Sequence, residues 1–200
     1  MTREIEPVNM REERRSFMQT KTRLVTLSAL FACVLSVSSV ISVPTPWGVP
    51  VTLQVFVVFL IAMILGPKVG TLACAIYIFF GLIGLPVYAG LSYGLPVLIG
   101  PSGGYLFGFV AGTFLGGFAC RKRAASKRSD TIRLILAALL SLFVIYVFGV
   151  LWLSLYLDNS LRYAILVGAL PFLPIDSVKA ILAIPIALET RWSRIEIPIL

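Results

Sequence analysis

A chain of 200 residues that is 58% hydrophobic and only 13% charged is too apolar for an ordinary soluble domain. Long apolar runs are typical of transmembrane helices, and the length allows one compact bundle. The net charge of +8 would suit a nucleic-acid-binding protein, but the basic residues gather in two segments beside apolar runs, 3–23 and 121–133. Basic residues beside membrane spans set the orientation of those spans, so we expect no nucleic acid partner.

The predicted fold class is an all-α membrane protein. The first 23 residues are polar, and we expect them to form a basic cytoplasmic tail. Six membrane helices are predicted to follow, at 24–43, 51–65, 69–85, 103–120, 132–157 and 175–188. A short helix within 161–170 is expected to lie at the membrane surface. Residues 24–190 then form one transmembrane domain, and residues 191–200 form a cytoplasmic carboxyl tail.

Six spans place both termini on one side of the membrane, together with the basic segment 121–133. The connections predicted on the other side contain a single basic residue, Arg162. The termini are therefore expected in the cytoplasm of a cell-membrane protein. The outer connections 44–50 and 86–101 carry no charge. Because irregular backbone at membrane depth must be buried or must line a cavity, these connections are expected to cap a pocket that opens outward.

Asp176 and Lys179 are two charges in an otherwise apolar stretch at the start of the last predicted helix. Charged residues in a membrane span are usually functional, and residues three apart share one helix face. We expect Lys179 to bind a ligand carboxylate and Asp176 to accept hydrogen bonds from ligand N–H groups. A purely structural ion pair and a proton-carrying role for Asp176 are the alternatives.

Four further residues are candidates for the pocket wall. Gln54 is a polar residue in an apolar run, so its amide binds either the ligand or a neighbouring helix. Trp47, Tyr88 and Tyr93 lie in the outer connections. They form either a stacking surface for a ring-bearing ligand or an aromatic belt at the membrane interface.

Ser102 lies within Gly100-Pro101-Ser102-Gly103-Gly104, which matches the G-x-S-x-G pattern of hydrolases. A nucleophilic serine needs a base, usually histidine, and the sequence contains no histidine. A tight entry into the following helix is the preferred interpretation, and an intramembrane hydrolase that uses Lys179 as base is the alternative. The sequence also lacks a phosphate-binding loop of the G-x-x-x-x-G-K-[ST] type. Energy for uphill transport must then come from a partner protein or from an ion.

Small residues recur at helical spacing in the first predicted helix. Such stripes let helices approach closely, either within the chain or against another membrane subunit. The stripe consists of Ser28, Ala29, Ala32, Cys33 and Ser36.

Five segments in order along the chain together resemble the BioY family, the biotin-binding S-components of energy-coupling factor (ECF) transporters. The segments are PVTLQ (50–54), LGP (65–67), GLPVYAG (84–90), GPSGGYLFGF (100–109) and LPFLPIDSVK (170–179). The resemblance covers about residues 24–188. The family usually has threonine where Ser102 stands, and serine keeps the hydroxyl.

The resemblance implies a six-helix S-component that binds biotin in an outward-facing pocket and has no enzymatic activity or cofactor of its own. It implies biotin contacts at Asp176 and Lys179, with Gln54, Trp47, Tyr88, Tyr93 and Ser102 as further candidates. It also implies assembly with a transmembrane coupling (T) subunit and two ATPase subunits, which would dock on the stripe of the first helix. The alternatives are an S-component for a different vitamin and an ion-coupled secondary transporter that uses Asp176.

Overall fold

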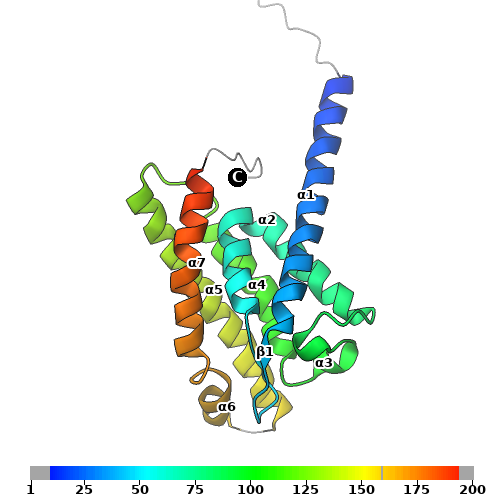
Figure 1. Cartoon of the computed structure of the whole chain (residues 1–200), viewed down its shortest axis with the longest axis vertical. Coiled ribbons are helices and arrows are strands. Elements are labelled where there is room, and N and C mark those ends of the chain that lie inside the picture. The colour runs from blue at the N-terminus through cyan, green and yellow to red at the C-terminus, as the bar shows by residue number, and fades with distance from the viewer. Residues whose placement is uncertain (1–9, 159, 194–200) are drawn as a thin grey trace, which may run out of the picture.

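The computed structural model describes residues 10–158 and 160–193, except for the side chains of residues 10–17 and 20. The described part is a bundle of apolar helices (Figure 1). The principal elements are α1 (Met10–Val40), α2 (Gln54–Leu82), α4 (Gly103–Ala119), α5 (Lys127–Tyr156) and α7 (Leu173–Trp192). The connections contain β1 (Ser42–Val43), β2 (Val51–Thr52), η1 (Ala89–Leu91), α3 (Leu95–Ile99) and α6 (Leu161–Gly168).

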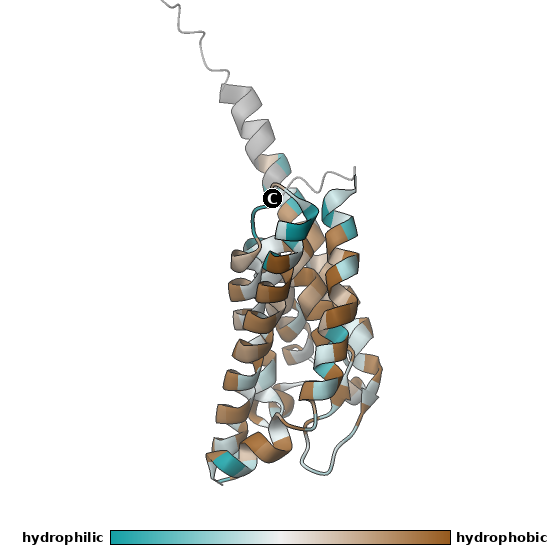
Figure 2. Ribbon diagram, turned by 90° about the vertical axis from the view of Figure 1, so that its left-hand side faces the viewer, coloured by the Kyte–Doolittle hydropathy of each residue, from teal (hydrophilic) through white to brown (hydrophobic). Residues whose placement is uncertain are grey.

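The described chain contains enough apolar helix for several membrane crossings. Residues Lys21–Val40, Gln54–Leu82 and Lys127–Tyr156 are each long and apolar enough to span a membrane, and α6 with α7 makes a fourth candidate that is bent by 53°. Hydrophobic residues cover most of the length of these helices, as Figure 2 shows. The start of α1 and the end of α7 lie at one end of the bundle, and β1, α3 and α6 lie at the other (Figure 1).

Gly66 divides α2 into two parts. Its φ of 71° and ψ of −174° are not helical, and Pro67 follows it. A positive φ suits glycine because it has no Cβ, and proline has no N–H to continue the helix. The expected break between the second and third helices is thereby confirmed. With the two parts of α2 counted separately, the principal helices follow the chain order that the sequence predicts.

Several helix boundaries differ from the prediction. α1 begins at Met10 and α5 at Lys127, both earlier than expected, and α7 continues to Trp192. The Ser126 side chain accepts a hydrogen bond from the backbone N–H of Ser129, which caps the start of α5. The short helix expected within 161–170 is present as α6. Residues 1–9 and 194–200 of the expected tails lie outside the described residues.

The connection between α1 and α2 folds into a short antiparallel hairpin that the sequence did not predict. Ser42 pairs with Thr52, and Val43 pairs with Val51. The Ser42 hydroxyl also accepts a hydrogen bond of 3.1 Å from the backbone N–H of Gly90. The hairpin is therefore joined to the connection between α2 and α4, on which η1 and α3 lie.

Glycines allow α4 and α5 to pack closely. A Cβ added at Gly108 would lie 2.9 Å from Cα of Ile145, and one added at Gly112 would lie 2.9 Å from the Ser141 carbonyl oxygen. Both distances are shorter than normal contacts. The two backbones can therefore approach this closely only because glycine has no side chain at these positions. This close packing gives α5 a fixed position in the bundle.

A buried ion pair that the sequence did not predict lies where α7 ends. Asp130 and Arg191 have fully buried side chains and form two hydrogen bonds, from Nε to Oδ2 at 3.0 Å and from Nη2 to Oδ1 at 3.2 Å. Arg191 also donates to the Met63 carbonyl at 2.8 Å, near the break in α2. The Trp192 indole N–H and the backbone N–H of Ala124 also donate hydrogen bonds to the Asp130 carboxylate, each at 3.0 Å.

Four parts of the chain meet at Asp130 and Arg191: the break in α2, the connection after α4, the start of α5 and the end of α7. Arg191 was expected in the carboxyl tail, but the structure places it in the last turn of α7. The sequence gives no local sign of this pair, because the two charges are 61 positions apart and each lies next to a basic or polar segment.

We predict that Asp130→Ala lowers the free energy of unfolding by about 3–5 kcal/mol, because it leaves the Arg191 charge buried without its partner. The matched control is Glu189→Ala, which breaks the exposed pair of Lys127 and Glu189, whose atoms are 2.9 Å apart. That change should alter stability by less than about 1 kcal/mol. Thermal unfolding of the purified variants in detergent measures both. Equal small losses would show that the buried pair contributes little.

Candidate functional site

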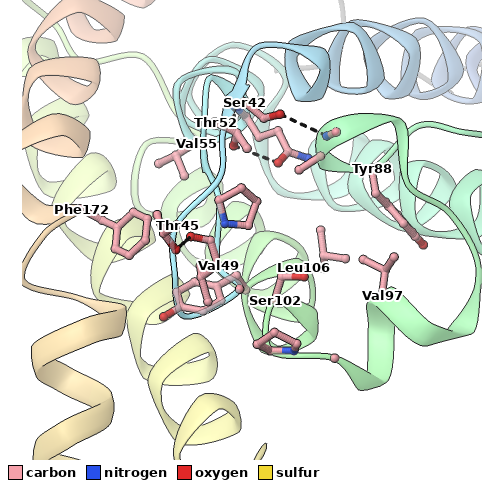
Figure 3. Close-up of a pocket in the computed structure, with 18 of the residues that line it drawn as sticks. Ser42, Thr45, Val49, Thr52, Val55, Tyr88, Val97, Ser102, Leu106 and Phe172 are labelled. Carbon is pink, nitrogen blue, oxygen red and sulfur yellow. Dashed lines mark hydrogen bonds between the residues drawn. The ribbon is translucent and has the colours of Figure 1, made fainter. Parts of the chain in front are cut away.

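A cavity of about 600 Å³ lies at the end of the bundle that carries the hairpin and α3. Its walls come from the hairpin and its loop, the connection between α2 and α4, the middle of α5 and the start of α7. In Figure 3, Thr52 and Val55 line one side, Tyr88 and Val97 lie on another, and Phe172 approaches from the connection before α7. The cavity is thus enclosed by segments that are far apart in the sequence.

Asp176 and Lys179 both line this cavity and are only 3% and 8% exposed. Lys179 Nζ lies 2.6 Å from Asp176 Oδ1 and 2.6 Å from the carbonyl oxygen of Thr52. The Tyr146 hydroxyl donates to Asp176 Oδ2 at 2.9 Å. Asp176 occupies the first turn of α7, where the helix dipole stabilises a negative charge. The two charges therefore neutralise each other while they border an open volume.

The ion pair keeps unused hydrogen-bonding capacity. An ammonium group has three N–H donors, and two of those on Lys179 go to Asp176 and Thr52. One donor remains. Each carboxylate oxygen of Asp176 accepts one hydrogen bond and can accept another. A ligand in the cavity that carries both an acceptor and a donor can bind both residues without breaking the pair.

Gln54 lines the cavity but directs its amide towards protein groups. Its Oε1 accepts a hydrogen bond of 2.9 Å from the Thr52 hydroxyl, and its Nε2 donates to the hydroxyl of Tyr77. The Gln54 amide thus links the hairpin to the second part of α2. Of the two roles considered for Gln54, these contacts support the link between helices.

Tyr88 forms part of the cavity wall and is held firmly. It is 1% exposed, and its hydroxyl donates to the Ile78 carbonyl at 2.6 Å. Its ring packs edge-on against Tyr77, with 5.6 Å between the ring centroids. A Cβ added at Gly81 would overlap the Tyr88 ring, so this glycine makes room for the wall.

The structure does not bring Trp47 or Tyr93 to the cavity wall. Tyr93 is 59% exposed, which is consistent with a position in an aromatic belt. Trp47 is half-buried, and its indole N–H has no acceptor among the described residues. These two residues therefore remain candidates on the sequence argument alone.

Ser102 lies on the cavity wall immediately before α4. The glycines around it form a tight helix entry: the backbone N–H of Gly103 donates to the Gly100 carbonyl at 3.1 Å, and a Cβ at Gly103 would lie 2.7 Å from the carbonyl carbon of Leu98. The Gly100 carbonyl also accepts a hydrogen bond from Trp152 Nε1 at 2.9 Å. These contacts account for the glycine-rich motif without a hydrolytic role.

The small-residue stripe on α1 divides into two faces. Ser28 and Ala32 are fully buried, and the Ser28 hydroxyl donates to the Val69 carbonyl on α2 at 3.1 Å. These two residues pack within the chain and present no surface to a partner, which corrects their place among the docking candidates. Ala29 and Ser36 are half-buried, and Cys33 is exposed. A docking face on α1 can therefore include only these last three.

Tyr146 carried no local signal in the sequence, and the positions of Thr52 and Phe172 in the wall follow from the fold. Tyr146 is one aromatic residue within a long apolar helix, and Thr52 acts through its backbone carbonyl. Phe172 lies between two prolines in the connection before α7. Thr52 and Phe172 lie in the motifs at 50–54 and 170–179, and the folding of distant segments onto Asp176 and Lys179 brings all three residues to the cavity wall.

Comparisons with known proteins agree on one family. The sequence model of the protein family described as the BioY family matches residues 10–195 of this chain. A protein named biotin transporter BioY from Thermotoga maritima is 41% identical over 84% of this chain and 96% of its own length. A probable biotin transporter BioY from Pyrococcus horikoshii is also 41% identical, over 84% of this chain and 95% of its own.

A solved structure has the same fold. The crystal structure of the S-component for biotin from an ECF-type ABC transporter matches with a TM-score of 0.75 and 29% sequence identity. The match covers 88% of this chain and 94% of that one. The described bundle is therefore an S-component fold.

Proposed function

This chain belongs to the BioY family, and from that premise we propose that it is the biotin-binding S-component of an ATP-driven vitamin importer. The observation that carries the proposal is the pair of Asp176 and Lys179 on the wall of a cavity of about 600 Å³. Ligand pockets commonly enclose about 300–1,000 Å³ and combine apolar walls with a few placed polar groups. The relatives named as biotin transporters support biotin as the ligand.

Biotin has chemical groups that complement this pocket. Because Lys179 Nζ and Asp176 Oδ1 lie 2.6 Å apart, biotin must fold its valerate chain back towards its ureido ring for both contacts to form. Its carboxylate can then accept the remaining N–H of Lys179 while a ureido N–H donates to Asp176. Its apolar ring system suits walls that include Tyr88 and Phe172. Gln54 supports the hairpin in this scheme, and the Ser102 hydroxyl offers one further polar contact. We propose that Trp47 and Tyr93 lie at the outer surface above the pocket.

The distribution of charge supports an orientation with the pocket facing outward. The basic connection between α4 and α5 contains Arg121, Lys122 and Arg123, and it lies at the end where α7 finishes. The opposite end carries the pocket. The positive-inside rule then places the basic connection and both termini in the cytoplasm and the pocket at the outer face of the cell membrane.

The importer also needs a source of energy that this sequence does not provide, since it contains no phosphate-binding loop. We propose assembly with a transmembrane coupling subunit and two ATPase subunits, with the chain itself acting as a ligand carrier and not as an enzyme. The matching S-component belongs to an ECF-type ABC transporter, which supports this assembly. The proposed docking surface for these subunits is the face of α1 that carries Ala29, Cys33 and Ser36.

We predict that the purified protein binds biotin and that Asp176→Asn weakens binding by between about tenfold and a hundredfold. The reason is the loss of hydrogen bonds to a charged acceptor, which contribute about 1.5–3 kcal/mol each. Equilibrium titration calorimetry measures both affinities. If the wild type fails to bind biotin but binds another vitamin, the proposed ligand is wrong and the alternative S-component is favoured.

A second prediction tests whether Lys179 binds the carboxylate of the ligand. Lys179→Ala should weaken binding of free biotin at least about tenfold more than binding of a biotin amide, because only the free acid has a carboxylate for the ammonium group. Competition binding with the two ligands measures the ratio. Equal losses for acid and amide would remove Lys179 from carboxylate recognition and leave it a partner of Asp176 alone.

A further inference from the structure

The orientation of the Asp176 carboxylate depends on two donors from different helices. Lys179 Nζ lies 2.6 Å from Oδ1, and the Tyr146 hydroxyl lies 2.9 Å from Oδ2. Lys179 is on the same helix as Asp176, three positions further on, so it moves with the carboxylate. Among the described residues, Tyr146 is the side chain from another helix that holds Asp176.

The helix that carries Tyr146 has a fixed position. α5 packs against α4 through glycines, and a Cβ at Gly108 would lie 2.9 Å from Cα of Ile145, the neighbour of Tyr146. A Cβ at Gly149 would overlap the ring of Tyr105, whose hydroxyl donates to the Gly168 carbonyl at 2.7 Å. The backbone on both sides of Tyr146 is thereby held against α4.

The terminal torsion of a carboxylate is broad, so an aspartate held through one oxygen can still rotate. A second donor on the other oxygen fixes the carboxylate plane. Both donors leave free lone pairs on Asp176, and Asp176, Lys179 and Tyr146 all line the cavity. Because Asp176 and Lys179 are only 3% and 8% exposed, their charge-assisted hydrogen bonds are stronger than similar bonds at the surface.

We propose that Tyr146 is a positioning residue for ligand recognition: its hydroxyl fixes the plane of the Asp176 carboxylate relative to α5, so that the carboxylate meets the N–H donors of the ligand in one orientation. This inference deepens the proposed function and rests on it. Tyr146 thereby couples the ligand to the α4–α5 pair as well as to α7.

The test is Tyr146→Phe, which removes one oxygen and keeps the ring. Biotin binding measured by calorimetry should weaken about tenfold, and the weakening should nearly disappear for a biotin analogue methylated on its ureido nitrogens, which cannot donate to Asp176. The control is Tyr156→Phe, since Tyr156 lies on the same helix, is 52% exposed and is not among the residues that line the cavity. That change should leave both affinities unaltered.

An infrared measurement on the ligand-free protein tests the positioning independently of affinity. The carboxylate stretch of Asp176 is identified as the band lost in Asp176→Asn, which is feasible because the chain has only nine Asp and Glu residues. In Tyr146→Phe this band should shift, and in Tyr156→Phe it should not. A purely structural role for Tyr146 would lower thermal stability without moving the band.

The outcomes separate this inference from the proposed function. If the wild type does not bind biotin, the proposed ligand fails. If the wild type binds biotin, but Tyr146→Phe binds it equally well or leaves the Asp176 band in place, the positioning role of Tyr146 is overturned while the proposed function stands.

Discussion

The desolvated ion pair of Asp176 and Lys179 is the interaction on which the rest of the structure depends. Two opposite charges in an apolar bundle are tolerable only when their remaining polar atoms are also satisfied. Here α5 supplies the Tyr146 hydroxyl, and the hairpin supplies the Thr52 carbonyl. The start of α7 is thus tied to the middle of α5 and to the connection between α1 and α2, which lines the pocket.

α7 is held at both ends by charges. Asp176 and Lys179 join its start to the pocket, and Arg191 joins its end to Asp130 on α5 and to the Met63 carbonyl on α2. A helix fixed in this way presents its polar face to the cavity in a single position. The proposed recognition of biotin requires that precision, because the affinity of a small ligand depends on preorganised polar groups more than on buried area.

The fold was largely predictable from the sequence, because membrane helices are long apolar runs and proline or glycine marks their ends. The same logic found Asp176 and Lys179, since a charge in an apolar run is a local signal. Tyr146 and the pairing of Asp130 with Arg191 have no such signal, because they depend on contacts between distant segments. Ser28 and Ala32 show where a local signal is ambiguous. Small residues predict close helix packing, but the sequence does not say whether the neighbouring helix belongs to the same chain.

The most direct test of this account is an experimental structure of the protein with biotin bound in a lipid environment. Biotin is expected within the cavity, in contact with the adjacent side chains of Asp176 and Lys179, with the Tyr146 hydroxyl still bonded to the Asp176 carboxylate. Biotin bound elsewhere, or the two charges turned away from the cavity towards lipid, would contradict it.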